Sequence, residues 1–308
     1  MSNWDFPCSD PVDISVESWV SGSVVVSGEP TSSVSVEVVP TRHNAHTDEL
    51  LAEVQVSFDD GQLHIRGPRG ISFRRRHGLD LTIKAPTGSS CSVATASADL
   101  SCIGQLSGLS MRTASGDVTA ESVTGDVTVQ SASGDILLNR AGGDVTINTA
   151  SGDIQASHVA GATRLNTASG DVVITSCGSS VTAHTASGDI QLGAVANGRV
   201  ELRSASGDMT VGVVPGLGVY LDLASTSGNV RSDLDPSDGG GHESGNAAVQ
   251  ISCRTLSGDI RIARASDEAA RLQAAEAQPA ETQPAETQPA KAQPADDADA
   301  TPAITAEP

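Results

Sequence analysis

Aromatic residues are scarce in this 308-residue chain. Tryptophan, tyrosine and phenylalanine together make up 2% of it, as two Trp, one Tyr and three Phe. A core built from Val, Ile, Leu and Ala must be thin and finely layered. The composition therefore excludes a helical bundle or a protein built around a large ligand cavity, and it favours packed β-structure.

Basic residues are also few. The chain carries 18 Lys and Arg against 38 Asp and Glu, which gives a formal net charge of −20. Contacts to phosphate dominate the affinity of proteins for nucleic acids, and an acidic surface opposes them. Nucleic acid is therefore excluded as an expected partner.

The chain has no apolar run near the roughly 20 residues that span a bilayer, so no membrane insertion is expected. Its first eight residues offer neither a basic nor an apolar region typical of a signal peptide. The cysteines are odd in number, form no Cys-x-x-Cys pair, and are Cys8, Cys91, Cys102, Cys177 and Cys253. Buried, reduced thiols in a cytoplasmic protein explain this pattern, and neither a zinc site nor any other cofactor is predicted.

A repeat dominates the chain from about residue 97. The sequence Thr-Ala-Ser-Gly-Asp-Val/Ile occurs at 113–118, 149–154, 167–172 and 185–190. Its glycines lie 18 residues apart at Gly116, Gly134, Gly152, Gly170 and Gly188. Weaker copies lie midway, so the unit is two half-repeats of nine residues. Self-similarity at a fixed period indicates a repeat architecture.

Each half-repeat translates into a turn and a short strand. Ser-Gly-Asp supplies the turn, and the next residues alternate between apolar and polar. The predicted inward pairs are Val118 and Ala120, Val127 and Val129, Ile136 and Leu138, Val145 and Ile147, Ile154 and Ala156, Val172 and Ile174, Ile190 and Leu192, and Met209 and Val211. Neighbouring coils would stack about 4.8 Å apart and share an aliphatic core. The predicted fold class is therefore all-β, a repetitive β-solenoid-like stack of about 18-residue coils with two short strands each.

The segments on either side of the repeat complete the predicted organisation. Residues 1–90 read as an N-terminal β-strand segment with one helical turn from Thr47, and 91–265 as the β-repeat domain. Within that domain the period weakens after Gly207, and a last repeat at 254–262 closes it. Residues 266–308 are rich in Ala, Glu, Gln and Pro and predict a disordered acidic tail, because so few large apolar residues cannot offset the entropy of ordering.

Four features together resemble the β-strand-repeat family known as domain of unknown function 4097, which carries the label "putative adhesin". They are the Ser-Gly-Asp-Val/Ile repeats, the hairpin at 59–65, the strand end Leu-Thr-Ile-Lys-Ala-Pro at 81–86, and the closing repeat at 255–262. The resemblance covers about residues 10–264. It implies an all-β, non-enzymatic protein, and it provides no catalytic residues.

The aspartates that follow the turn glycines form the most regular polar series. Asp117, Asp135, Asp153, Asp171 and Asp189 would lie in one column and suggest a calcium ladder. Here, however, Asp directly follows Gly, without the spacers of the calcium-binding nonapeptide repeat. Two carboxylates about 4.8 Å apart in water repel by only about 0.9 kcal/mol, so turn hydrogen bonds suffice without a cation. The primary prediction is a structural turn, and calcium binding is the alternative.

Two further patterns bear on function. Ser-Gly-Asp recurs at turn after turn, whereas a catalytic serine is normally singular, so no enzyme is predicted. The single basic cluster, Arg69 with Arg74, Arg75 and Arg76, reads either as a solvated loop or as a docking point for an acidic partner.

These observations predict a non-enzymatic β-repeat scaffold or protein-interaction module that is able to self-associate. An open end of the stack could pair its strands with another copy. A glycan is a further candidate partner of the polar repeat face. The alternatives are a cell-surface adhesin exported by an unrecognised route, and a calcium-dependent β-repeat protein.

Overall fold

The computed structural model describes residues 1–41, 47–68, 78–234 and 248–266. Within these ranges, 23 strands form one continuous hydrogen-bonded network, and the only helix is the seven-residue α1 (Thr47–Glu53). No helix in the described part of the chain is long and apolar enough to cross a bilayer. The predicted all-β class and the helical turn from Thr47 are both confirmed.

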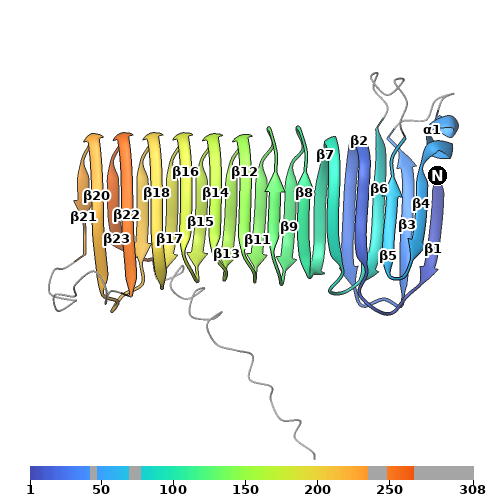
Figure 1. The fold of residues 1–308 in the computed structure, drawn as a ribbon, viewed down its shortest axis with the longest axis horizontal. Helices are drawn as coiled ribbons and strands as arrows, with labels where there is room; N and C mark the ends of the chain where they lie inside the picture. The colour runs from blue at the N-terminus through green and yellow to red at the C-terminus, as the bar shows by residue number, and fades with distance from the viewer. Residues whose placement is uncertain (42–46, 69–77, 235–247, 267–308) are drawn as a thin grey trace, which may run out of the picture. The chain divides into compact units, whose positions relative to one another are not determined.

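Residues 108–234 and 248–264 form a stack of parallel strands in two columns, as the repeat predicts (Figure 1). The first column consists of β8 (Gly108–Arg112), β10 (Val127–Gln130), β12 (Val145–Ser151), β14 (Thr163–Ser169), β16 (Val181–Ser187), β18 (Gly198–Ser206), β22 (Val249–Ser257) and β20 (Val219–Ser227). The second consists of β9 (Val118–Val123), β11 (Ile136–Ala141), β13 (Ile154–Val159), β15 (Val172–Cys177), β17 (Ile190–Val195), β19 (Met209–Val213), β23 (Ile260–Arg264) and β21 (Val230–Ser232).

Two long strands join the stack to the N-terminal segment. The first half of β7 (Ser90–Leu106) pairs with β8 and its second half with β9, so this strand belongs to both columns. The strand β2 (Asp13–Glu29) pairs with β7 along both halves. Pairing therefore continues without interruption across residue 90.

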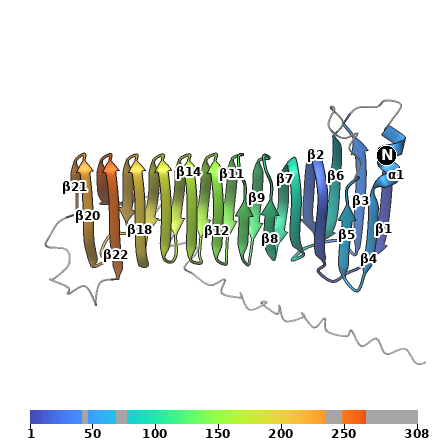
Figure 2. The same cartoon turned by 45° about the horizontal axis from the view of Figure 1, so that its top comes forward.

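The N-terminal end adds antiparallel strands. β5 (Gln62–Arg66) and β6 (Leu79–Pro86) run parallel to β2, and β4 (Gln55–Asp59) runs antiparallel to β5. β3 (Ser33–Pro40) pairs antiparallel with β6 and with β1 (Ser2–Pro7). Figure 2 shows these strands gathered beside α1 at one end of the stack.

A single aliphatic core extends through the stack, from Val12 to Ile262. Every predicted inward residue from Val118 to Val211 is at most 3% exposed, so the assignment of faces is confirmed. Full burial of such a side chain contributes about 1.5–3 kcal/mol. The coils are thus held together mainly by aliphatic burial and by the parallel hydrogen-bond ladders.

The turn glycines lie directly against the backbone of the preceding coil. Gly152 has a φ of +116°, and a Cβ on it would lie 2.1 Å from the carbonyl oxygen of Gly134. The threonine of the repeat tightens the same turn, because Thr149 Oγ1 donates a hydrogen bond to the carbonyl of Ser151 at 2.8 Å. The recurrence of Thr-x-Ser-Gly follows from these two local requirements.

The order of coils departs from the chain order at the C-terminal end. β22 and β23 insert between β18–β19 and β20–β21, so β20 and β21 form the last coil of the stack (Figure 1). The repeat at 254–262 is therefore the last along the chain, as predicted, but not the last coil of the stack. The inward residues Val249 and Ile251 of β22 and Ile260 of β23 are 0–1% exposed. The more regular apolar repeat occupies the inner position, where both of its edges are paired.

Candidate functional site

Most of the aspartates after the turn glycines form one continuous column along the stack, whereas Asp126 and Asp144 form a separate, shorter series. The Oδ1 atom of each accepts a hydrogen bond from the backbone N–H of the next residue in the column, at 2.7–3.0 Å. The column runs through Asp99, Asp117, Asp135, Asp153, Asp171, Asp189, Asp208, Asp259 and Asn229. One oxygen of each carboxylate therefore links consecutive coils, which gives these residues a structural task.

The structure thus brings together the five aspartates considered as a calcium ladder. Among the described residues, no group of three or more His, Cys, Asp or Glu is placed to hold a metal ion. Calcium binding by the column stays a prediction that experiment has to decide.

The four arginines of the predicted docking cluster, Arg69, Arg74, Arg75 and Arg76, lie outside the described residues, and so does the predicted tail from residue 267. The structure instead shows a different basic site, which sequence reasoning missed.

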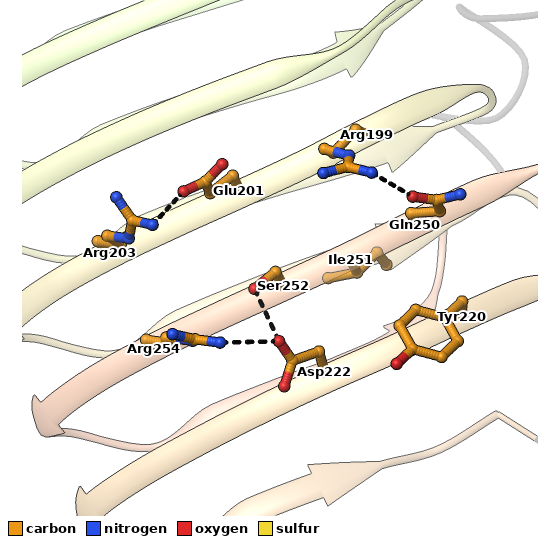
Figure 3. Close-up of a pocket in the computed structure, with 9 residues that line it drawn as sticks. All are labelled: Arg199, Glu201, Arg203, Tyr220, Asp222, Gln250, Ile251, Ser252 and Arg254. Atoms are coloured by element: carbon orange, nitrogen blue, oxygen red, sulfur yellow. Dashed lines mark hydrogen bonds and ion pairs between the residues drawn. The ribbon is translucent and has the colours of Figure 1, made fainter. Parts of the chain in front are cut away.

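A groove crosses the outer face of the first column at its last three strands (Figure 3). We call it the arginine groove. It encloses about 300 Å³ and is lined by Arg199, Glu201 and Arg203 of β18, Gln250, Ile251, Ser252 and Arg254 of β22, and Tyr220 and Asp222 of β20.

Strand register explains the shape of the groove. The outward residues form three cross-strand rows, which are Arg199–Gln250–Tyr220, Glu201–Ser252–Asp222 and Arg203–Arg254–Ala224. Ser252 lies at the centre of this array, and it is shorter than the Glu201 and Asp222 side chains on either side. The hollow therefore lies over the middle of β22.

Each arginine of the groove already holds one polar partner. A terminal nitrogen of Arg254 lies 3.1 Å from Asp222 Oδ2, one of Arg203 lies 2.5 Å from Glu201 Oε1, and one of Arg199 lies 2.9 Å from Gln250 Oε1. The side chains of Arg203 and Arg254 remain 54% and 60% exposed. These contacts orient the guanidinium groups while leaving them open to solvent.

A weak signal for this groove exists in the sequence. Elsewhere the outward positions of the first column carry mostly Thr, Ser and Asn, whereas those of 199–203 and 250–254 carry Arg, Glu and Gln apart from Ser252. Arg203 and Arg254 are adjacent only because β22 inserts beside β18. The local pattern marks the residues, but their proximity depends on the crossover.

A second hollow, of about 370 Å³, lies near the N-terminal end. It is lined by Ser15 and Glu17 of β2, Gln55 and Ser57 of β4, and His64, Ile65 and Arg66 of β5. Its arginine, Arg66, forms an ion pair with Glu17 at 3.2 Å. The arginine groove therefore presents more positive charge than this second hollow.

The contact between His158 and Ser176 bears on catalysis. His158 Nδ1 lies 3.2 Å from Ser176 Oγ, and the two residues are 7% and 0% exposed. A catalytic serine must reach a substrate, so this buried pair is best read as part of the core.

Comparison with known proteins identifies the fold family. The family model described as Toastrack DUF4097 matches residues 12–263. The comparison with curated proteins found no match.

Solved structures with similarity to this chain are distant. One is a putative cell adhesion protein from Clostridium sporogenes, at 11% identity and a TM-score of 0.22, over 85% of this chain and 99% of that one. A putative adhesin from Bacteroides fragilis matches at 12% identity and a TM-score of 0.35, over 85% and 96%. A putative lipid binding protein from Parabacteroides distasonis matches at 13% identity and a TM-score of 0.35, over 85% of this chain and 96% of that one. These matches carry no functional assignment to this chain.

Proposed function

Because the chain belongs to the Toastrack DUF4097 family, whose description names no reaction, we propose that it is a non-enzymatic scaffold that associates with a second copy of itself through the last coil of its stack. The observation that carries the proposal is the contrast between the two ends of the stack.

The N-terminal end is covered by large side chains. Phe6 of β1 stacks on Phe58 of β4 with ring centroids 5.2 Å apart, and Trp4 packs against the same core. Leu51 of α1 is only 9% exposed there. Aromatic rings and a helix cover the core at this end, although β1 and β4 each have a strand partner on one side only among the described residues.

The last coil, β20 and β21, has no equivalent cover among the described residues. Val219, Leu221 and Leu223 occupy core positions but are only partly buried. Val230 pairs with the buried Ile260, yet it is 47% exposed. The aliphatic core therefore reaches solvent at this end.

The backbone of the last coil is also available for pairing. The N–H of Val249 donates to the carbonyl of Gly218 at 3.2 Å, so alternate residues of β20 starting with Gly218 direct their peptide groups toward β22. By the alternation of a β-ladder, Val219, Leu221 and Leu223 direct theirs toward the open edge. Unpaired strand edges of this kind are templates for further strand pairing.

A second copy is the partner that fits this end best. Its last coil has the same two strands at the same separation, and a two-fold axis would place both edges antiparallel to their partners. The exposed core positions of both copies would then cover one another. A two-fold contact of this kind uses the last coil of both copies, so the contact by itself produces a dimer.

The mass of the full-length protein in solution tests this proposal. Leu221→Lys places a charge at the open edge and is expected to convert the dimer to a monomer, as measured by size-exclusion chromatography with light scattering. Leu137→Lys is the matched control, because Leu137 is an outward residue, 42% exposed, on a strand paired on both sides. A wild-type protein that stays monomeric at high concentration would overturn the proposal.

The two alternatives make separate predictions. An exported adhesin would be recovered at the cell surface on fractionation, whereas a cytoplasmic scaffold would not. A calcium-dependent repeat protein would show a large rise in melting temperature with calcium but not with magnesium.

A further inference from the structure

We propose that the arginine groove binds a short acidic oligosaccharide, whose uronic-acid carboxylate is held by the arginines and whose ring lies against Tyr220. The two arginines Arg203 and Arg254 lie away from the proposed dimer edge, on β18 and β22, which are both paired on each side. Tyr220 and Asp222 lie on β20, which forms that edge, so binding is measured at a protein concentration where the oligomeric state is known.

Charge is the first argument. Arg199, Arg203 and Arg254 converge on one groove that also holds Glu201 and Asp222, so the groove carries one net positive charge. The whole chain has a formal charge of −20. A local excess of positive charge on such a background favours an anionic ligand.

The geometry of the donors is the second argument. Each contact reported for these arginines uses one nitrogen of a guanidinium that carries five N–H donors. The backbones of Arg203 and Arg254 are paired on adjacent strands, about 4.8 Å apart. Their guanidinium groups hold Glu201 of β18 and Asp222 of β20. With the backbones at this spacing, the remaining N–H donors of the two guanidinium groups can bind one ligand carboxylate, which accepts hydrogen bonds in pairs.

The acceptors in the groove select among anions. Glu201, Asp222 and Ser252 form its central row and can accept hydrogen bonds from ligand hydroxyls. A bare anion or an acidic peptide has no hydroxyl groups to donate to these acceptors. A ligand with both a carboxylate and several hydroxyl groups can contact the arginines through its carboxylate and the central row through its hydroxyl groups.

Tyr220 supplies an apolar surface for the ligand. Its side chain is 43% exposed and stands on the edge strand β20, beside the Gln250 end of the groove (Figure 3). An exposed ring with an apolar face and a polar tip is suited to a sugar, which is itself amphipathic. The volume of about 300 Å³ lies at the lower end of the range for small-ligand sites, so the ligand is short.

Calorimetric titration of the full-length protein with trigalacturonate tests the inference. Saturable binding is expected, and neutral maltotriose is expected to bind at least about tenfold more weakly, because it lacks the carboxylates. The double variant Arg203→Gln with Arg254→Gln is expected to weaken trigalacturonate binding by about tenfold or more.

The matched control is Arg112→Gln. Arg112 lies in the same row of outward residues as Arg203 and Arg254, about 24 Å from Arg203 and five strands earlier. This control should leave the affinity unchanged. Tyr220→Ala changes an exposed residue and provides a second test if the double variant does not fold. It is also expected to weaken trigalacturonate binding.

Three results would overturn the inference. They are the absence of saturable heat with trigalacturonate, an affinity that neither the double variant nor Tyr220→Ala changes, and equally tight binding of inorganic phosphate or hexaglutamate. The last result would show an anion site without selectivity for sugars.

Discussion

Each residue of the Ser-Gly-Asp turn has its own physical task. The glycine allows the close approach of consecutive coils, since a Cβ on Gly170 would lie 2.2 Å from the carbonyl oxygen of Gly152. The aspartate then accepts the backbone N–H of the next coil, as Asp153 does from Asp171 at 2.8 Å. The repeat therefore satisfies, within each turn, backbone groups that would otherwise depend on water.

Replacing Asp135, Asp153 and Asp171 together by Asn separates the structural task from calcium binding. The Asn side chain keeps an oxygen acceptor, so thermal unfolding is expected to be nearly unchanged and insensitive to calcium in both proteins. Asp153→Ala removes the acceptor and is expected to cost about 0.5–1.5 kcal/mol in the free energy of unfolding. Stabilisation by calcium, but not by magnesium, that disappears in the triple Asn variant would instead establish the calcium ladder.

The buried thiols predict a loss of stability at alkaline pH. Burial raises the pKa of Cys177 to about 12, from an unperturbed value of 9.0. The unfolded chain therefore releases this proton above pH 9 while the folded chain retains it, so folding stability falls as pH rises from 9 toward 12.

The loss attributable to Cys177 between pH 9 and pH 11 is expected to be of the order of 2 kcal/mol. Urea unfolding of the wild type and of Cys177→Ala at both pH values measures it. The variant should lose less stability over this interval, and identical losses in the two proteins would contradict the assignment.

At the scale of elements, the decisive feature is the insertion of β22 and β23 before the last coil. After β19 the chain leaves room for one coil and forms β20 and β21 beyond it. It then returns, and β22 and β23 fill the position between them and β18–β19.

The last coil is also attached by ion pairs of Asp233, which lies 2.8 Å from Arg231 and 2.9 Å from Arg261. Hydrogen bonds from Arg231 and then Arg261 lower the pKa of the Asp233 carboxyl.

Disulfide trapping distinguishes this order from stacking in chain order. Glu201→Cys with Ser252→Cys is expected to cross-link on mild oxidation, because paired residues on adjacent strands lie within disulfide range. Glu201→Cys with Asp222→Cys should not cross-link, because β22 separates the two positions. The reverse result, read by mass spectrometry of the digested protein, would restore the sequential order.

At the scale of the whole molecule, net charge opposes self-association. Each copy carries a formal charge of −20, so two copies repel one another until salt screens their charges. The driving force at the last coil is aliphatic burial and strand pairing, which salt does not weaken in this way.

The dimer fraction should therefore rise with ionic strength. Sedimentation equilibrium at about 0.01 M and 0.1 M salt, where the screening length falls from about 30 Å to about 10 Å, measures the effect. Leu221→Lys should remain monomeric at both. A dimer that dissociates as salt rises would show that ion pairs, rather than the open core, hold it together.

The sequence by itself determined the coil length, the two strands per coil, the inward residues and the long column of aspartates. These follow from local requirements, because alternation of side chains and the conformation of glycine act within a few residues. The series from Val118 to Val211 therefore takes its predicted face without exception.

Only the tertiary structure decided which coil ends the stack and which outward residues become neighbours. The sequence shows a repeat at 254–262 but not its place, since any two coils of similar apolar pattern can pair. The order depends on whether β20–β21 or β22–β23 takes the inner position, where a coil is paired on both sides. That choice depends on contacts between segments far apart in the sequence. It leaves Leu221 at an open edge and places Arg254 beside Arg203, so both proposed interaction sites arise from the same crossover.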